Sequence, residues 1–245
     1  VINNVVDYTN YVLYDIGQPL HAFDRDKLFG DISVRFAQDS EELLTLDNQK
    51  RKLTKNDLII VADDRPIALA GVMGGLDTEV TSETTNLLIE SAYFDKVSIM
   101  NTSRKLNLIS DASIRFERGI DRNLQMLGLN RFINIFQNNQ DLDYSEPFED
   151  IKDEYDNPEI SFSRTEIYKL LGINLQDEFI ENMLNYLGID YEITDSDIKF
   201  SQPSWRYDLE RPVDLIEEFA KHYGFNNFES TLPIGSNKND VGSYW

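Results

Sequence analysis

The sequence predicts an α+β protein of two successive domains. Short strand-like runs mixed with helical patterns fill residues 1–150, which predicts a domain with a mixed sheet. Residues 144–157 are rich in Asp, Glu and Pro, which is typical of a linker. Residues 151–245 then show the order helix, helix, strand, strand, helix. A chain of 245 residues fits roughly one to two domains.

The composition is that of a globular protein, because apolar residues make up 41% of the chain. No apolar run approaches the roughly 20 residues of a membrane helix, so we expect no membrane partner. The lack of cysteine excludes disulfides, thiolate zinc sites and a cysteine nucleophile, and it fits a reducing compartment. No zincin, zinc-ribbon or P-loop motif is present. The chain does not begin with Met and shows no signal peptide, and we expect it to be a piece of a longer protein.

The net charge of −21 argues against a protein whose whole surface holds nucleic acid, because that affinity comes mainly from Lys and Arg. Alternatively, the acidity serves only solubility. The densest basic group flanks residues 110–113. It consists of Arg104, Lys105, Arg115, Arg118 and Arg122. These side chains could guide a phosphate backbone, or they could pair with the carboxylates beside them.

The expected elements of the first block follow the chain in order. A helix is predicted over Asn3–Ile16, with a capping start and an end near Gly17. Residues 18–24 follow as an extended turn. Strands are predicted at the apolar runs Ile32–Ala37, Glu42–Leu46, Leu58–Ala62, Ile67–Val72 and Leu87–Phe94. A helix is expected from Asp121 to the polar run Gln137–Asp143.

The second block has clear start and stop signals. Ser163 and Glu166 form a capping box that opens a helix ending at Gly172. A second helix carries an apolar face around Ile180 and Leu184 and stops at Gly188. Strands are predicted at residues 189–193 and 198–201, and a third helix runs from Pro212, a first-turn residue, to Gly224. This order is winged-helix-like.

The first candidate site lies within residues 69–121. Three glycines let the backbone approach a ligand or adopt positive φ, namely Gly71, Gly74 and Gly75. Glu90 interrupts an apolar run, where a carboxylate is costly to bury without a partner. Residues 110–113 form a polar turn before a helix start. These features predict a small pocket with one polar reader; the alternative is a solvent-facing Glu90 at a strand edge and ordinary turn glycines.

The chain has two histidines. His21 lies in the QPLHAFD turn and could act as a general base or an orienting donor near neutral pH. The alternative is a purely structural hydrogen bond. His222 lies near a helix C-terminus, where the helix dipole favours its protonated form, and we expect a structural role for it.

The second candidate site is the third helix of the second block. Asp214, Glu217 and Glu218 share one helix face at spacings of i, i+3 and i+4, and Asp208 lies just upstream. Oxygen ligands of this kind suit Mg²⁺. The alternative is an acidic, solvated helix face whose first-turn charges favour the helix dipole.

Five motifs together carry a resemblance to a known family. They are TNYVLYDIGQPLHAFD, ALAGVMGG, LLIESAYFD, SDASIRFERGID and PSWRYDLERPVDLIEE. In this order and spacing they resemble the beta subunits of bacterial phenylalanyl-tRNA synthetases over nearly the whole chain. The resemblance implies an editing domain at residues 1–150, followed at 151–245 by a winged-helix-like domain with an acidic third helix and a C-terminal tail.

The resemblance also implies a function, namely hydrolysis of Tyr wrongly esterified to tRNA(Phe), without aminoacylation by this chain alone. The implied partners are the alpha subunit, in an alpha2beta2 tetramer, and tRNA(Phe). The implied location is the cytoplasm. A phenylalanine pocket cannot strongly reject an isostere that adds a hydroxyl, so a second site is useful.

Residue roles carry over by position. Glu90 matches the reader of the tyrosine hydroxyl, while Gly74 and Ala112 match pocket-wall positions with room for the aminoacyl group. His21 and Asn10 match positions near the ester and the terminal adenosine. We expect a positioned water to attack the ester, with the general base left open.

Two further implications concern single positions. Ser110 stands where the family usually has threonine, so the hydroxyl is kept and a methyl is lost. Asp208, Asp214, Glu217 and Glu218 match positions that the family assigns to a Mg²⁺ shared with the alpha subunit.

Two other functions compete with editing. The chain could be a non-catalytic architectural module for alpha-subunit association and tRNA placement, which the acidic surface and the lack of a nucleophile favour. It could also be a winged-helix nucleic-acid binder, but the second block carries few basic residues to follow phosphates.

Overall fold

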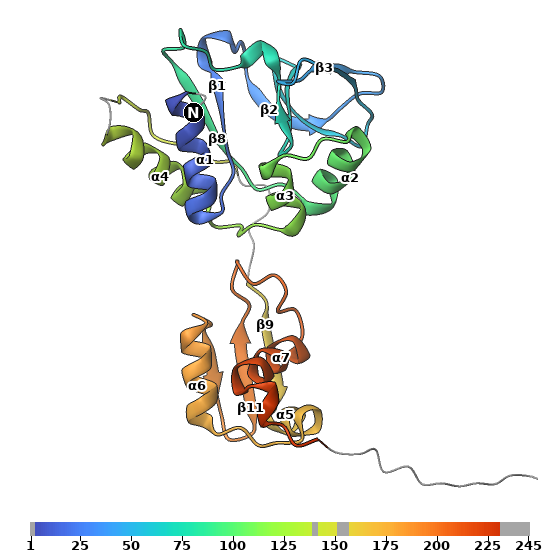
Figure 1. Ribbon diagram of the computed structural model, residues 1–245, viewed down its shortest axis with the longest axis vertical. Helices are drawn as coiled ribbons and strands as arrows, with labels where there is room; N and C mark the ends of the chain where they lie inside the picture. Colours follow the sequence, from blue (N-terminus) through green and yellow to red (C-terminus); the bar gives the residue numbers. More distant parts are fainter. Residues whose placement is uncertain (1–2, 139–141, 151–156, 231–245) are drawn as a thin grey trace, which may run out of the picture. The chain divides into compact units, whose positions relative to one another are not determined.

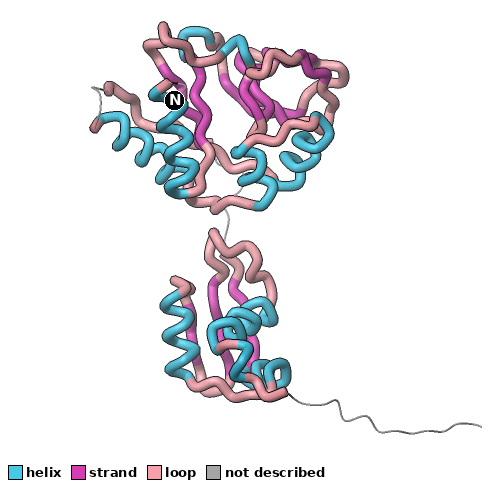
Figure 2. Tube along the Cα trace, in the orientation of Figure 1, coloured by secondary structure: helices cyan, strands magenta, loops and turns pink. Residues whose placement is uncertain are grey.

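The computed structural model describes residues 3–138, 142–150 and 157–230. The chain divides into two compact units, residues 1–155 and 156–245, and each is treated by itself. Figures 1 and 2 show helices and strands in both units, so the predicted α+β class is confirmed. The predicted linker is without helix or strand at residues 144–150, whereas residues 151–156 and the predicted tail at 231–245 lie outside the described part.

The first unit is built from short strands, three small antiparallel sheets and four α-helices within its described residues. Its elements are α1 (Asn4–Ile16), β1 (Leu20–Asp24), β2 (Ile32–Phe36), β3 (Glu42–Leu44), β4 (Lys50–Lys52), β5 (Leu58–Ala62), β6 (Arg65–Leu69), β7 (Met73–Gly74), β8 (Leu87–Ser91), α2 (Lys96–Leu106), α3 (Asp111–Arg118) and α4 (Gln125–Gln137). The strand orders are β1-β8, β2-β5-β6-β7 and β3-β4. In place of one mixed sheet, every pairing among these strands is antiparallel.

Helix α1 begins and ends where the capping signals predicted. The Asn3 side chain accepts a hydrogen bond from the Val6 amide at 2.8 Å, which satisfies one of the free amides of the first turn. Gly17 ends the helix at φ 83°, a left-handed conformation that glycine adopts without steric cost, and its amide donates to Leu13 at 3.0 Å.

The two-stranded ribbon β1–β8 separates two hydrophobic cores. Successive strand residues point to opposite faces, so each face of the ribbon takes alternate positions. Leu20, Leu87 and Ile89 lie on one face and pack with α1 and α4, which run side by side in Figure 1. Phe23 and Leu88 lie on the other face and join the main core under β5 and β6.

Within residues 157–230, the second unit packs three α-helices with a three-stranded sheet of order β10-β11-β9. Its elements are β9 (Glu159–Ser163), α5 (Arg164–Leu171), α6 (Asp177–Tyr186), β10 (Tyr191–Ile193), β11 (Asp197–Ser201) and α7 (Pro212–Tyr223). The predicted capping box and glycine stop of α5 are confirmed. The apolar face of α7 is buried, with Leu215 and Phe219 fully enclosed.

Several elements differ from the sequence prediction. The expected turn at residues 18–24 contains strand β1, which pairs with β8 over its whole length. Helix α2 and strand β9 were not expected, and α4 begins at Gln125 and not at Asp121. Within the described residues, none of the helices is both long and apolar enough to pass through a bilayer.

Asp57 is the most completely satisfied buried carboxylate of the first unit. Its side chain is 1% exposed and ion-pairs with Lys105. It also accepts hydrogen bonds from the Thr54 amide at 2.8 Å and the Thr102 hydroxyl at 2.9 Å. Burial acts to raise the pKa of Asp57, but the Lys105 ammonium and these donors outweigh it and hold the pKa below its usual value.

We expect Asp57→Asn to destabilise the first unit by about 2–4 kcal/mol, because Lys105 loses its buried partner. A depressed carboxyl pKa contributes stability that is complete above the unfolded pKa of about 4 and is lost as the pH falls below it. Urea unfolding followed by circular dichroism measures both effects. Glu42→Gln, which removes the exposed pair with Lys50, is the control; equal losses in the two variants would contradict the assignment.

Candidate functional site

His21 and Glu90 are brought together by the register of the ribbon. They are direct partners across β1 and β8. Side chains opposite each other in an antiparallel pair share a face, with Cβ atoms about 4.5–5.5 Å apart. Both side chains are partly buried on the face turned to the main core. Among the described residues, neither side chain makes a hydrogen bond or an ion pair, so the carboxyl and the imidazole keep their hydrogen-bonding capacity.

Burial shifts both groups toward their uncharged forms. It raises the pKa of the Glu90 carboxyl to about 7. It lowers the pKa of the His21 imidazole to about 4. In each case the loss of hydrating water penalises the charged form. At neutral pH the imidazole is uncharged and the carboxyl is close to half ionised, so this pair can accept or donate hydrogen bonds without a fixed ion pair.

Gly74 lies directly against His21. It is the last residue of β7, at the edge of the four-stranded sheet. A Cβ placed on Gly74 would fall 2.5 Å from Cε1 of His21 and would also collide with Nε2. Strand β7 of the four-stranded sheet therefore meets the ribbon at the His21 ring. Three of the predicted site residues, His21, Gly74 and Glu90, thus lie together.

Ser110 and Ala112 lie at the start of α3, next to the residues that connect β6 to β7. Ser110 is the N-cap of α3, accepts from the Ser113 amide at 3.1 Å and donates to the Val72 carbonyl at 2.7 Å. The hydroxyl that the sequence keeps at this position thus ties the helix to the segment leading into Gly74. Ala112 is partly buried against the main core. Its side chain is a single methyl group, so the first turn of α3 takes up little space at this position.

Asn10 is exposed on α1, and no contact with the other predicted residues places it at the site. It lies one turn before Tyr14, and residues four apart share a helix face. The Tyr14 hydroxyl donates to Asp111 at 2.8 Å, which ties α1 to the first turn of α3. The helix face that carries Asn10 is therefore the one turned toward α3.

This tie was missed by sequence reasoning. A cavity of about 280 Å³ lies beside it and is lined by Tyr14, Asp111, Ile114, Arg115, Arg118 and Gly119. The hydrogen bond to Asp111 and the charge of that carboxylate raise the pKa of Tyr14. The available signal was the basic group around residues 110–118, but nothing in the pattern indicated a tyrosine from the first helix.

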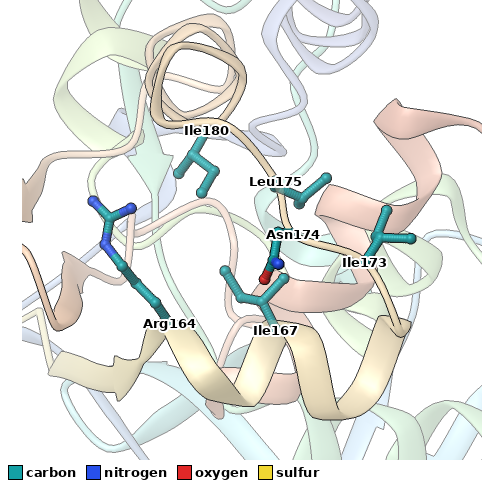
Figure 3. Close-up of a pocket in the computed structure, with 6 residues that line it drawn as sticks. All are labelled: Arg164, Ile167, Ile173, Asn174, Leu175 and Ile180. Atoms are coloured by element: carbon teal, nitrogen blue, oxygen red, sulfur yellow. The ribbon is translucent and has the colours of Figure 1, made fainter.

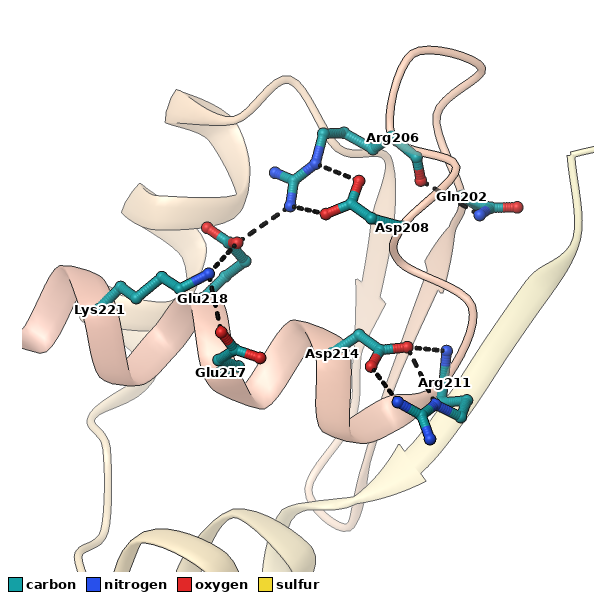
Figure 4. Close-up of polar contacts among 8 residues, drawn as sticks. All are labelled: Gln202, Arg206, Asp208, Arg211, Asp214, Glu217, Glu218 and Lys221. Carbon is teal, nitrogen blue, oxygen red and sulfur yellow. Dashed lines mark hydrogen bonds and ion pairs between the residues drawn. The ribbon is translucent and has the colours of Figure 1, made fainter. Parts of the chain in front are cut away.

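The acidic face of α7 is neutralised by basic side chains of its own unit (Figure 4). Arg206 holds Asp208 at 2.7 Å and Glu218 at 3.0 Å. Lys221 contacts Glu217 at 3.0 Å and Glu218 at 3.1 Å. Asp214 pairs separately with Arg211 at 2.8 Å and caps the helix start.

These carboxylates do not fit a Mg²⁺ site as they are arranged. A divalent cation needs several oxygen ligands converging on one point. In the part of the chain that the structure describes, no three acidic or histidine side chains are grouped so that they could hold a metal. The Arg206 guanidinium lies between Asp208 and Glu218 and bonds to both carboxylates.

The second unit also contains a cavity of about 210 Å³ between α5, α6 and the loop that joins them (Figure 3). Its lining is mostly aliphatic, with Ile167, Leu175 and Ile180 among its walls. The one charged side chain, Arg164, is already engaged with Asp177 and with the Thr194 carbonyl. Asn174 is the other polar side chain of the lining, so the described lining offers a ligand one side-chain amide and no unpaired charge.

Comparison with known proteins follows the division into two units. The model of the B3/4 domain family matches residues 1–140, and that of the tRNA synthetase B5 domain matches residues 160–225. Phenylalanine–tRNA ligase beta subunits are similar over nearly the whole chain. That of Staphylococcus haemolyticus is 42% identical, over 95% of this chain and 29% of the relative. That of Lactiplantibacillus plantarum is 41% identical, over 96% of this chain and 29% of the relative.

A third relative, from Fusobacterium nucleatum, is 38% identical over 96% of this chain and 30% of its own length. An N-terminal fragment of the phenylalanyl-tRNA synthetase beta-subunit from Pyrococcus horikoshii is 17% identical, over 90% of this chain and 65% of the fragment, with a TM-score of 0.44. The chain belongs to the B3/4 domain family, followed by a B5 domain, and the resemblance to bacterial phenylalanine–tRNA ligase beta subunits is confirmed over about 29% of their length.

Proposed function

We propose that the first unit hydrolyses tyrosine wrongly esterified to tRNA(Phe). The observation that carries this proposal is the Glu90 carboxyl, which is partly buried, has a raised pKa and makes no hydrogen bond within the described residues. Perturbed, unpartnered carboxyls are typical of functional sites. The relatives named above are phenylalanine–tRNA ligase beta subunits, which makes an aminoacylated tRNA the substrate class to test first.

Glu90 can read the tyrosine hydroxyl by accepting its hydrogen bond. Phenylalanine in the same place would leave the carboxyl without a partner, at a cost of about 1–3 kcal/mol. That difference supports a preference of roughly tenfold to a hundredfold for the tyrosyl ester, because each 1.4 kcal/mol changes a rate ratio tenfold. The site would thus reject the cognate amino acid, as a proofreading site must.

The chemical step needs a water molecule and a group to orient it. The described residues place no Ser or Asp in hydrogen-bond contact with His21, so the geometry does not supply a serine–histidine–acid set. The uncharged His21 ring can accept a proton from an attacking water or hold that water in place. The substrate's own ribose hydroxyl is the other candidate. Ser110 hydrogen-bonds to Val72, just before the strand that ends at Gly74. Asn10 lies on the α1 face turned to α3, where a terminal adenosine could bind.

In the cell we propose that the chain works as part of a larger cytoplasmic enzyme. A beta subunit implies an alpha partner, and the resemblance suggests an alpha2beta2 tetramer that binds tRNA(Phe) and synthesises Phe-tRNA on the other subunit. The acidic surface supports a division of labour in which most tRNA contacts come from elsewhere. The exposed Arg104 and Arg115 near α3 are the local exception.

The competing function is an architectural module that associates with the alpha subunit and places the tRNA without hydrolysis. The ion-paired surface of α7 would suit such a role. Deacylation of Tyr-tRNA(Phe) by this chain, with Phe-tRNA(Phe) as the control, separates the two. Selective release of tyrosine supports editing. Release by neither this chain nor the assembled enzyme would leave the architectural function.

Glu90→Ala should abolish the preference for Tyr-tRNA(Phe) over Phe-tRNA(Phe), because it removes the acceptor that we propose for the tyrosine hydroxyl. We expect the rate ratio to fall by roughly tenfold to a hundredfold. Single-turnover deacylation of both esters measures it. Glu83→Ala, which changes an exposed loop carboxylate, is the matched control. Wild-type selectivity in the Glu90 variant would exclude Glu90 as the reader.

The preference for tyrosine should rise with pH through about 7, where the Glu90 carboxyl ionises. A carboxylate accepts the hydroxyl hydrogen bond more strongly than a carboxylic acid does. Because the folded pKa is raised, ionisation also opposes folding, so wild-type stability should fall as the pH rises through the same range. Glu90→Gln should show neither trend. Rate ratios and thermal unfolding from about pH 6 to about pH 8 test both, and a pH-dependent ratio in the variant would refute the assignment.

The predicted Mg²⁺ shared with the alpha subunit stays a prediction. Because Arg206 forms ion pairs with Asp208 and Glu218, we expect calorimetric titration to show no Mg²⁺ binding by this chain alone. In the assembled enzyme, changing Asp208, Asp214, Glu217 and Glu218 to amides should weaken Mg²⁺-dependent subunit association. Association and activity that are unaltered by these changes would count against the metal.

A further inference from the structure

Gly74 and His21 compete for the same space. A Cβ on Gly74 would lie 2.5 Å from Cε1 of the His21 ring, closer than any real Cβ contact. The backbone of Gly74 does not itself call for glycine, because Gly74 is absent from the residues with positive φ. An alanine could therefore adopt the backbone conformation without strain. What the missing side chain provides at this position is room for an imidazole.

The His21 ring is held from the other sides as well. It packs edge-on against Phe23, two residues along β1, with ring centroids 4.5 Å apart. Phe23 is 1% exposed and belongs to the main core. The backbone of His21 is fixed by the pairing with Glu90 on β8. The ring can move only away from Gly74, and that would change the space beside the Glu90 carboxyl.

We propose that Gly74 is a positioning residue that acts through His21: its bare backbone seats the imidazole beside Glu90. This inference rests on the proposed function for its catalytic meaning. It assigns Gly74 a different role from the predicted one, which is to leave room for the aminoacyl group and which stays a prediction. In this arrangement the substrate meets the His21 ring and the Glu90 carboxyl, while Gly74 sets how deep the ring lies. The glycine and the histidine then work as one unit.

Among the described residues, the contacts bring one ionisable group to the His21 ring, namely Glu90. Phe23 from β1 and Gly74 from β7 are its uncharged neighbours, and Glu90 on β8 is the ionisable group that faces it. A ring moved out of this seat would gain hydration and become easier to protonate. The protonation of His21 therefore reports its position without any substrate.

The first test is an NMR titration of the histidine Cε1 protons in the full 245-residue chain. The chain has two histidines, so His222→Ala leaves the His21 signal alone, and His21→Ala identifies the other. In the wild-type background His21 should stay uncharged from about pH 8 down to about pH 5.5. In Gly74→Ala it should titrate, moving toward its ordinary pKa of about 6.5. An unchanged His21 titration in Gly74→Ala would overturn the proposal.

The second test is a double-mutant cycle, read by thermal unfolding and by deacylation of Tyr-tRNA(Phe). Gly74→Ala should lower both in the wild-type background. In a His21→Ala background the space beside Gly74 is empty. The same change should then alter the deacylation rate by less than about twofold and the unfolding temperature by only about one or two degrees, because the effect of Gly74→Ala depends on the His21 ring. An equal loss in both backgrounds would show that Gly74 acts on the substrate or the fold directly.

The two proposals fail in different ways. If the wild-type chain and the assembled enzyme release no tyrosine, the editing function fails, while the titration and the unfolding cycle still decide whether Gly74 seats His21. If editing occurs but the cycle shows no coupling, the seat is overturned and the editing function stands. The double variant also covers the case in which Gly74→Ala alone does not fold, since removal of the ring should restore folding.

Discussion

The antiparallel register of β1 and β8 is the constraint on which the first unit depends. It directs Leu20, Leu87 and Ile89 to the α1–α4 side and Phe23 and Leu88 to the main core. A slip by one residue would exchange every side chain between these faces, and both cores would be lost together. The same register sets His21 opposite Glu90. The candidate site is therefore specified by hydrophobic packing on both sides of the ribbon and not by contacts between its own polar groups.

Two carboxylates of the first unit show how the structure separates stability from function. Asp57 is enclosed and receives an ammonium and several donors, so its charge stabilises the fold. Glu90 is partly buried and receives none within the described residues. Burying the Glu90 carboxyl without a partner costs folding free energy, since the group loses hydration and gains no hydrogen bond in exchange. That cost is tolerable because burial is incomplete and the carboxyl can hold its proton near neutral pH.

Much of the fold followed from local signals, and the site followed from them only in part. Asn3, Gly17, Ser163 and Gly172 marked helix ends correctly, because capping is a local interaction. Strand β1 was predicted as a turn, since His21 and Asp24 within it and Pro19 just before it give a weak strand pattern, which the pairing with β8 overrides. Glu90 stood out as a carboxylate in an apolar run, but its pairing with His21 is a long-range contact that no spacing encodes. The contacts of Arg206 with Asp208 and Glu218 span only 2 and 12 residues, but the spacing of the acidic residues alone does not show that an arginine lies between these carboxylates.

The ends of the ribbon have a consequence for how this unit could have been assembled. Asp24 and Leu87 are partners at the last rung, and the Arg25 amide donates to the Asn86 carbonyl at 2.9 Å just beyond it. The segment that contains β2–β7 therefore leaves the ribbon and returns to it at two adjacent points, one strand spacing apart. The four-stranded sheet and the β3–β4 pair are together an insertion between the two strands of the ribbon. Lengthening this insertion adds little to the entropic cost of closing the chain between β1 and β8. Its outer loops can therefore change in length while the end of the ribbon and the His21–Glu90 pair keep their geometry.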